Sequence, residues 1–396
     1  MPNDSVDPKL LLRDEISNLP NIKLGVKYDE FAKANPDLEL IRLGSNENPY
    51  GPSPRVLEAI QQHLSEVNLY PDNTCADIAV KMAEQLGVDP ARLIFDCGAE
   101  SILVLLLNLC LRPGDKVVSM SPSFPVINIF SAAVGAEVIG VPHEDDLTFS
   151  ADKFCEALQD NVRMLYLCMP NNPTGSYFTG PDLEKIVAAA SPETLFVLDE
   201  AYVEFAQDKP DFPDAIRILE SAGQPYISLR TMSKAYALAG MRIGYGIGYS
   251  EEFTGLLKRA NTVFNVGVLT LKAAEAALED KAHLEKYLSA VSSEKARLEQ
   301  ELGSRGVRLF NSAGNFICVS LPTLEQAQAV EAGMQQSGIF IKAQKGRELA
   351  SQGSEGVLRI TIGKPAENDR MLAELLALIY IFFGKHLNCS FIFIKK

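Results

Sequence analysis

Lys234 occupies an unusual position for a lysine, in the stretch TMSKAYALAGMRIGY (231–245). Its neighbours are small, hydroxylated or apolar and no carboxylate stands near it, whereas most lysines lie on a charged, solvated face. Desolvation and a nearby cation such as Arg242 lower the pKa of an amine, which then becomes a nucleophile. The hydroxyls of Thr231 and Ser233 and the guanidinium of Arg242 are groups that hold a phosphate. A Ser-Lys pair alone is common in ordinary structural settings, so its surroundings decide its meaning.

A second candidate phosphate-binding element is the motif CGAES (97–101), in which Gly98, Ala99 and Glu100 are expected to open a helix. Free backbone N–H groups and the helix dipole make such a helix start a phosphate site. Small residues also begin helices for purely steric reasons. The motif is therefore only compatible with phosphate binding.

Two further motifs place polar side chains directly after apolar runs. In PNNPTG (170–175), two prolines and a glycine fix a rigid turn that can hold Asn172 in one orientation. In VLDEAY (197–202), Asp199 follows an apolar run, and Tyr202 can point into the same space. A carboxylate in such a place is costly unless it meets a cation or a strong donor. A plain turn, a helix cap or a structural ion pair are the alternative interpretations.

Together, these features match the needs of one cofactor, pyridoxal 5′-phosphate. Its phosphate needs N–H and hydroxyl donors, and its aldehyde needs a lysine. Its ring nitrogen needs a carboxylate that keeps it protonated, so that the ring withdraws electrons. The four motifs supply these groups in order along the chain.

The sequence resembles the fold-type I PLP-dependent aminotransferases, most closely the histidinol-phosphate aminotransferase-like subgroup. The resemblance spans almost the whole chain in family order. Beside the motifs above it includes SNENPYGPSP (45–54), YPD (70–72), SPSF (121–124) and LRITIG (358–363).

The resemblance implies a cofactor-binding role for residues along the chain. Lys234 matches the Schiff-base lysine, which also moves the Cα proton, and Asp199 matches the partner of the pyridine nitrogen. Tyr202 and Asn172 match the pair that hydrogen-bonds the phenolic oxygen of the ring, and Phe124 matches the aromatic residue that stacks on it. The matching phosphate donors are Ala99 and Glu100 through their backbone N–H groups, with Ser233, Arg242 and Thr231.

The resemblance also implies substrate and subunit contacts. Tyr70 matches a tyrosine that reaches the phosphate of the neighbouring subunit's cofactor, which implies a homodimer. Arg359 matches the arginine that grips the substrate α-carboxylate, and Asn48 is expected on the substrate side. Lys342 stands where this subgroup usually has an arginine for the substrate phosphate. Lysine is a point charge without the bidentate fork of arginine.

The pattern of helices and strands that must position these residues predicts an α/β protein. Near-continuous apolar runs separated by helical patterns predict a mostly parallel, seven-stranded sheet covered on both faces, with ligands beyond the carboxyl ends of the strands. The runs are RLIFDCG, KVVSMSP, EVIGVP, RMLYLCMP, LFVLDEAY, YISLRTMS and GYGIGY. A long helical stretch at about 266–303 precedes a smaller α+β domain. We expect a segment 1–50 that partly joins the small domain, a large domain 51–285 and a small domain 286–396.

Composition narrows the class of partner and compartment. The formal net charge of -14 argues against nucleic acid and anionic membranes as partners. Seven scattered cysteines without a C-x-x-C pair favour free thiols in a reducing cytoplasm. Four widely separated histidines predict no metal site. The apolar run Leu375–Gly384 is too short to span a bilayer, so we expect a packed helix there.

We therefore expect a homodimeric transaminase that moves an amino group from L-histidinol phosphate to 2-oxoglutarate. An aminotransferase for aromatic or other amino acids is the first alternative. A decarboxylase or an oxidase on the same cofactor scaffold is the second, because the cofactor-binding residues serve all these reactions. A non-catalytic binding protein fits poorly, since Lys234, Asp199 and Arg359 are all present.

Overall fold

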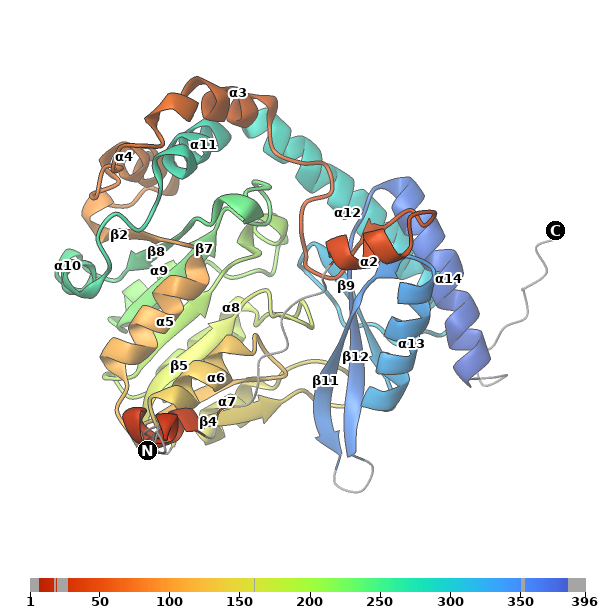
Figure 1. Cartoon of the computed structure of the whole chain (residues 1–396). Coiled ribbons are helices and arrows are strands. Elements are labelled where there is room, and N and C mark those ends of the chain that lie inside the picture. Colours follow the sequence, from red (N-terminus) through yellow and green to blue (C-terminus); the bar gives the residue numbers. More distant parts are fainter. Residues whose placement is uncertain (1–6, 18, 20–27, 160, 350–352, 384–396) are drawn as a thin grey trace, which may run out of the picture.

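A seven-stranded sheet forms the larger part of the molecule (Figure 1). The structure is a computed structural model and describes residues 7–17, 19, 28–159, 161–349 and 353–383. The strands lie in the order β2-β8-β7-β6-β5-β3-β4. Their bounds are Leu93–Asp96 (β2), Lys116–Ser121 (β3), Glu137–Pro142 (β4), Val162–Cys168 (β5), Leu195–Asp199 (β6), Tyr226–Thr231 (β7) and Gly244–Gly248 (β8). β8 is antiparallel to both its neighbours and the other pairs are parallel, which confirms the mostly parallel sheet.

Helices cover both faces of this sheet because its central strands are apolar on both sides. On one face Ile102 and Leu106 of α5 pack against Met164 of β5 and Val197 of β6. On the other face Phe154 and Leu183 pack with Leu165 of β5. The covering helices are α5 (Ala99–Cys110), α6 (Val126–Ala133) and α10 (Glu251–Ala260) on the first face, and α7 (Ala151–Ala157), α8 (Gly180–Ala189) and α9 (Ala215–Ala222) on the second.

A third group of helices packs at the β2–β8 end of the sheet. Val56, Ile78 and Ala274 share one buried cluster with Tyr245 of β8. These helices are α3 (Pro54–Gln62), α4 (Ala76–Leu86) and α11 (Val268–Glu279). Short 3-10 turns occur at Leu64–Glu66 (η2), Pro90–Arg92 (η3), Val203–Phe205 (η4) and Ala239–Met241 (η5).

A second, three-stranded antiparallel sheet forms the smaller part, in the order β11-β12-β9. The strands are β9 (Phe316–Leu321), β11 (Lys342–Leu349) and β12 (Gly353–Thr361). The helices that pack with it are α12 (Lys281–Gly303), α13 (Leu324–Gln336) and α14 (Pro365–Phe383). Alternate residues of β12, Leu358 and Ile360, point into this core, so Arg359 and Thr361 face away from it.

The N-terminal region divides between the two parts. The 3-10 turn η1 (Pro8–Leu11) is followed by α1 (Asp14–Ser17), which lies against α6 of the large part (Figure 1). By contrast, β1 (Ile41–Arg42) pairs in parallel with β10 (Ile339–Phe340) of the small part. The helix α2 (Tyr28–Ala34) packs its aromatic rings edge-on against Phe340.

The helical stretch expected at 266–303 is two helices. α11 ends at Glu279 and α12 begins at Lys281, because the side chain of Asp280 accepts a hydrogen bond from the backbone N–H of His283 and begins a new helix. The expected domain boundary at 285/286 falls inside α12, and the boundaries at 50/51 and 285/286 stay predictions.

α14 is the helix expected near the end of the chain, and its buried Met371 and Leu375 pack into the small core. None of the helices in the described ranges is long and apolar enough to cross a membrane. The tail 384–396, with Cys389, lies outside the described residues.

Candidate active site

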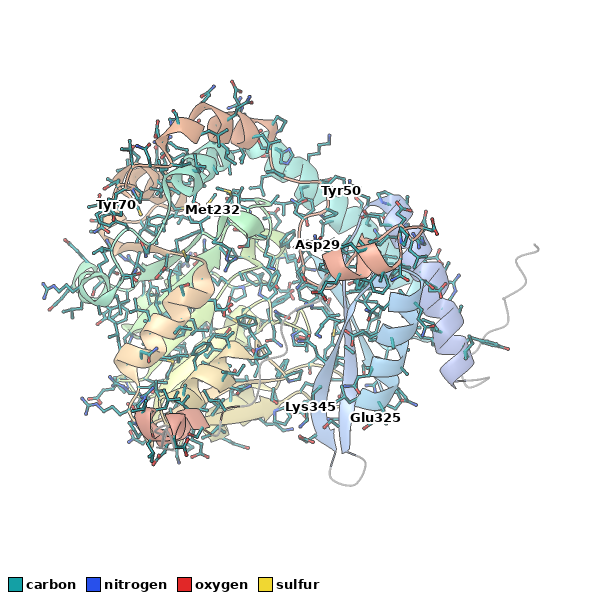
Figure 2. The ribbon with its side chains drawn as sticks, viewed as in Figure 1. Asp29, Tyr50, Tyr70, Met232, Glu325 and Lys345 are labelled. Atoms are coloured by element: carbon teal, nitrogen blue, oxygen red, sulfur yellow. The ribbon has the colours of Figure 1, made fainter. Side chains whose placement is uncertain are left out.

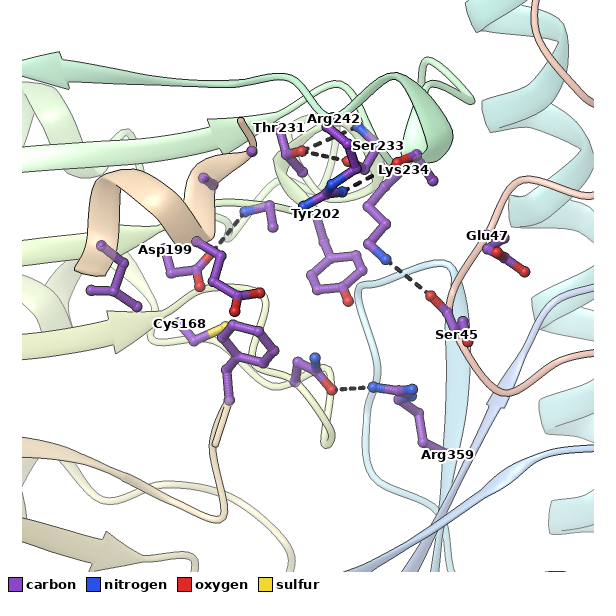
Figure 3. Close-up of a pocket in the computed structure, with 18 residues that line it drawn as sticks. Ser45, Glu47, Cys168, Asp199, Tyr202, Thr231, Ser233, Lys234, Arg242 and Arg359 are labelled. Carbon is purple, nitrogen blue, oxygen red and sulfur yellow. Dashed lines mark hydrogen bonds between the residues drawn. The ribbon is translucent and has the colours of Figure 1, made fainter. Parts of the chain in front are cut away.

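A cavity of about 420 Å³ opens where β5, β6 and β7 end (Figure 3). Eleven of the residues singled out in the sequence line it, namely Ala99, Glu100, Phe124, Asn172, Asp199, Tyr202, Thr231, Ser233, Lys234, Arg242 and Arg359. Figure 3 shows the side chains of Lys234 and Arg359 entering the same space, with the Tyr202 ring beside the lysine. The sheet topology therefore brings together residues that are 260 positions apart.

Tyr70, Asn48 and Lys342 do not line this cavity. Tyr70 is 81% exposed on the outer edge of the large part (Figure 2) and stacks on Phe264, with ring centroids 4.5 Å apart. Asn48 lies in an adjoining hollow, and its Nδ2 donates to the carbonyl of Ala235 at 3.3 Å. Lys342 lies opposite Arg359 in the β11–β12 register, but its Nζ is 3.8 Å from Glu331. Their functional roles stay predictions.

One end of the cavity is rich in donors. α5 begins at Ala99, after Gly98 with a φ of 96°, which a side chain would make strained. The hydroxyl of Thr231 donates to that of Ser233 at 2.9 Å. Arg242 donates only to backbone carbonyls, those of Ala239 and Cys97. Within the described ranges it has no carboxylate partner. This set fits a dianionic phosphate.

Asp199 is a buried carboxylate at the end of β6. Its Oδ2 accepts from the hydroxyl of Tyr166 at 2.5 Å, and its Oδ1 accepts from the backbone N–H of Ala201 at 3.2 Å. Burial raises the pKa of this carboxyl, and these two hydrogen bonds offset the effect only in part. No ion pair joins it to any residue that the structure describes. A protonated ring nitrogen would supply the missing positive charge.

The amine of Lys234 is the nucleophile expected from the sequence. Its Nζ donates to the carbonyl of Ser45 at 3.0 Å and lies 5.9 Å from the centre of the Tyr202 ring. Burial, followed by the nearby charge of Arg359, lowers its pKa to about 8. About a tenth of this amine is therefore uncharged at pH 7, far more than for an ordinary lysine.

Arg359 carries a buried guanidinium with spare donor capacity. One terminal nitrogen donates to Asn172 Oδ1 at 2.6 Å and the other donates to the carbonyl of Gly44. Its Nε has no hydrogen-bond partner, and no carboxylate of the described chain pairs with it. Burial lowers the pKa of this guanidinium. An anion bound beside Arg359 would satisfy the unused N–H and the charge together.

The sequence did not single out five polar or thiol groups that lie at the cavity or directly behind its wall. Tyr166 holds Asp199, Asn46 donates to the Tyr202 hydroxyl at 2.9 Å, and Ser45, Glu47 and Cys168 line the wall. Asn46 stands in the motif SNENP, but its neighbour Asn48 received the prediction. Tyr166 shares a strand face with Cys168, which alone does not reveal that the hydroxyl meets Asp199.

The charges and hydrogen-bond donors of these residues fit pyridoxal phosphate. A buried carboxylate and a buried guanidinium each lack an ionic partner in the described chain, and an amine of lowered pKa lies in the same cavity. The donor-rich start of α5 lies at the phosphate end. In the described ranges there is no group of three or more side chains that could hold a metal ion.

Known proteins resemble this chain over most of its length. The family model described as "Aminotransferase class I and II" matches residues 39–376. The chain is 36% identical over 369 residues to "Histidinol-phosphate aminotransferase 1" of Mesorhizobium japonicum, covering 93% of this chain and 98% of that protein. It is 37% identical over 339 residues to "Histidinol-phosphate aminotransferase 2" of Pseudomonas aeruginosa, covering 85% and 88%. The crystal structure of the Sinorhizobium meliloti histidinol-phosphate aminotransferase, solved with pyridoxal-5′-phosphate, superposes with a TM-score of 0.81 and 28% identity, covering 93% of this chain and 97% of that one.

Proposed function

Since the chain belongs to the class I and II aminotransferases, we propose that it transfers the amino group of L-histidinol phosphate to 2-oxoglutarate. It is a PLP-dependent transaminase, and pyridoxal 5′-phosphate is its cofactor. The donor follows from likeness to relatives named for that activity. The observation that carries the reaction type is one cavity lined by Lys234, by Asp199 with its buried carboxylate, and by Arg359, whose guanidinium has no carboxylate partner in the described chain.

The side chains divide the work of amino transfer among them. When bound, the cofactor supplies an aldehyde that captures the donor nitrogen and a ring that withdraws electrons from its Cα. Lys234, with its lowered pKa, takes the Cα proton as a base and later returns a proton as an acid. Asp199 keeps the ring nitrogen protonated, and Tyr202 and Asn172 hold the phenolic oxygen of the ring.

The cofactor is held at its phosphate and across its ring. The backbone N–H groups of Ala99 and Glu100, with the side chains of Thr231, Ser233 and Arg242, bind the phosphate. Phe124 stacks on the ring. These groups orient the cofactor, since all of them line the same cavity.

Arg359 binds the anionic group of both substrates in turn. In L-histidinol phosphate, Cα carries a methylene phosphate where an amino acid carries its carboxylate, so a single guanidinium meets either anion. Its place in the cavity wall and the absence of a carboxylate partner in the described chain support this role. Lys342 adds a point charge from the adjacent strand, and Asn48 lies at the substrate entrance beside the cavity.

We also propose that the enzyme works as a cytoplasmic homodimer. Tyr70 does not line the cavity of its own chain, is exposed, and stacks on Phe264. Exposed apolar side chains occur in the segment that leads to Tyr70 and beside Phe264, namely Leu64, Val67, Leu69 and Val263. A second copy of the chain would cover them and would receive the Tyr70 hydroxyl at its cofactor phosphate.

An amino-donor screen on the cofactor-loaded enzyme tests the substrate. Histidinol phosphate, phenylalanine, tyrosine and arginine are each offered with 2-oxoglutarate, and glutamate formation is measured. We expect kcat/KM to be highest for histidinol phosphate. A clear preference for an unphosphorylated donor would instead favour an aminotransferase for other amino acids.

A single-turnover experiment without dioxygen tests the reaction type. The donor alone should change the absorbance of the bound cofactor, and 2-oxoglutarate added later should restore it. Release of carbon dioxide would indicate a decarboxylase, and peroxide formed in air would indicate an oxidase. Lys234→Ala is the control and should lose multiple turnovers.

A further inference from the structure

Asn46 is a fully buried asparagine that belongs to neither sheet and touches both parts of the molecule. Its side-chain Nδ2 donates to the hydroxyl of Tyr202, which belongs to the large part, at 2.9 Å. Its backbone carbonyl accepts from Asn315 at 3.2 Å, and its backbone N–H donates to the hydroxyl of Thr361 on β12 at 2.9 Å. Its φ of 53° lies in the left-handed region that asparagine tolerates better than most residues.

The hydrogen bonds around Asn46 leave its amide only one orientation. The Thr361 hydroxyl oxygen already accepts from the Asn46 backbone, so its own proton goes to an acceptor, and Asn46 Oδ1 lies 3.1 Å away. Because Oδ1 receives that proton, the amide must present Nδ2 to Tyr202. Thr361 is 1% exposed, so water does not compete at this point.

This orientation settles where the Tyr202 proton can go. The hydroxyl oxygen of Tyr202 accepts a hydrogen bond from Asn46 Nδ2. Because Asn46 turns its donor and not its acceptor toward Tyr202, the hydroxyl proton of Tyr202 must point elsewhere. Among the described residues no acceptor lies within hydrogen-bond distance of it. Tyr202 lines the cavity, so this unused donor is directed at whatever occupies it. Burial raises the pKa of Tyr202 to about 12, which keeps the phenol protonated.

We propose that Asn46 is a positioning residue that turns the Tyr202 hydroxyl proton toward the phenolic oxygen of the cofactor ring. The proposal rests on the proposed function, which places that oxygen beside Tyr202. β12 sets the orientation through Thr361. Arg359 lies two residues before Thr361 on the same face of β12. The strand therefore couples the position of Arg359, which binds the substrate anion, to that of Asn46, which aligns Tyr202.

The test measures the pH midpoint at which the absorbance of the bound cofactor changes. Asn46→Asp keeps the shape and tolerates the left-handed backbone, but it replaces the donor with an acceptor that draws the Tyr202 proton away. A donor lost from the phenolic oxygen favours its protonated form, so the midpoint should rise by about 0.5–1 pH unit. Tyr202→Phe should raise it in the same direction. Asn46→Gly frees the Tyr202 hydroxyl without offering it a new acceptor, so the midpoint should rise by a smaller amount. This variant also provides a test if Asn46→Asp does not fold.

The double variant separates positioning from a general effect of charge or packing. If Asn46 acts through the hydroxyl, Asn46→Asp should leave the midpoint unchanged in a Tyr202→Phe background. Asn35→Asp, just beyond α2, controls for the added net charge and should match the wild type, because the Asn35 side chain donates to the carbonyl of Phe31 and does not line the cavity. A shift of Asn46→Asp that persists without the Tyr202 hydroxyl would overturn the proposal.

The outcome is separable from that of the proposed function. The wild-type donor screen judges the function, whereas the absorbance midpoints judge Asn46 without any turnover. An unchanged midpoint in Tyr202→Phe would show that the Tyr202 hydroxyl does not donate to the phenolic oxygen of the cofactor. The inference about Asn46 would then fail, even if the enzyme transaminates histidinol phosphate.

Discussion

At the scale of single residues, burial of Lys234 makes its amine more reactive and also lowers the free energy of unfolding. Burial and then the charge of Arg359 lower its pKa from 10.5 to about 8. The unfolded chain therefore holds this proton more tightly than the folded chain. Between pH 8 and 10.5 the unfolded state binds more protons, so the free energy of unfolding rises with pH across this window.

Lys234→Met should accordingly stabilise the cofactor-free protein. At pH 7 the folded wild type carries the full cost of its buried ammonium, so the variant should unfold at higher urea with a gain of about 1–3 kcal/mol. The gain should shrink from pH 8 to pH 10.5, as the wild type releases the proton. Urea unfolding at a series of pH values measures it, and Lys286→Met on the exposed face of α12 is the control. A gain that is constant with pH would contradict the prediction.

The residues of the site that the sequence predicted share one property. Asn172, Asp199 and Lys234 each follow an apolar run, and the carboxyl ends of parallel strands meet at one edge of the sheet. Asn46 and Tyr166 lack such a signal. Asn46 meets Tyr202 across 156 residues and Tyr166 meets Asp199 across 33, and such pairings depend on side-chain packing that local sequence does not encode.

At the scale of elements, the start of α5 depends on Gly244 of β8. A Cβ built at Gly244 would lie 2.1 Å from the backbone nitrogen of Ala99, one of the expected phosphate donors. Gly244→Ala must therefore push α5 away from β8. Overpacking of this kind costs about 1–3 kcal/mol.

We expect Gly244→Ala to weaken cofactor affinity as well as stability. The measurements are urea unfolding and a titration of cofactor-free protein with pyridoxal phosphate, followed by absorbance. Gly255→Ala in α10, where a Cβ would meet nothing within 4 Å, is the matched control and should be neutral or slightly stabilising. Unchanged cofactor affinity in Gly244→Ala would show that the α5 start does not depend on this contact.

The same scale shows where the fold could and could not be predicted. All seven expected strands form, because runs such as those of β5 and β6 are apolar on both faces and end in polar residues. The antiparallel direction of β8 was not predictable, since direction depends on how the chain returns to the sheet and not on the composition of the strand. The break between α11 and α12 has a local cause in Asp280, but a single aspartate inside a helical pattern is also tolerated.

At the scale of the whole molecule, a buried contact between a histidine and a glutamate joins the two parts. His143 follows β4 of the large sheet, and its Nε2 lies 2.9 Å from Glu355 Oε2 on β12. Burial would raise the pKa of Glu355, but contacts with His143 and Ser320 outweigh it and leave the pKa below its ordinary value of 4.5. The stabilisation it provides is present above pH 4.5 and is lost as the pH falls through the lowered pKa.

Glu355→Gln should weaken the connection between the two parts. Glutamine keeps the shape but removes the charge that faces His143 and Ser320, and the loss of a hydrogen bond to a charged group costs about 1.5–3 kcal/mol. Thermal and urea unfolding at pH 7 measure the loss, and the difference from wild type should shrink as the pH falls below 4.5 and Glu355 takes up a proton. Glu348→Gln, exposed on β11, controls for the loss of a surface carboxylate. A difference that stays constant as the pH falls from 7 through the acid range would rule out the ionised carboxylate of Glu355 as its source.

The proposed homodimer, in which Tyr70 reaches the site of the neighbouring subunit, can be tested with mixed dimers of two variants. In a dimer of one Lys234→Ala subunit and one Tyr70→Phe subunit, one site combines the intact Lys234 of the second subunit with the intact Tyr70 of the first. The other site lacks both. Random pairing of equal amounts gives half mixed dimers, so the mixture should reach about a quarter of the wild-type activity at limiting cofactor.

Each parent homodimer should fall short of that value, because one lacks the amine at both sites and the other lacks the Tyr70 hydroxyl at both. Co-expression with two different tags isolates the mixed dimer, and activity per dimer is then measured against added pyridoxal phosphate. The Val263 and Phe264 side chains beside Tyr70 must be covered in that assembly, so Val263→Asp should shift the protein toward the monomer on size-exclusion chromatography. If the mixture shows only the average of the two parents, Tyr70 serves no neighbouring site. In that case its exposed ring needs another explanation.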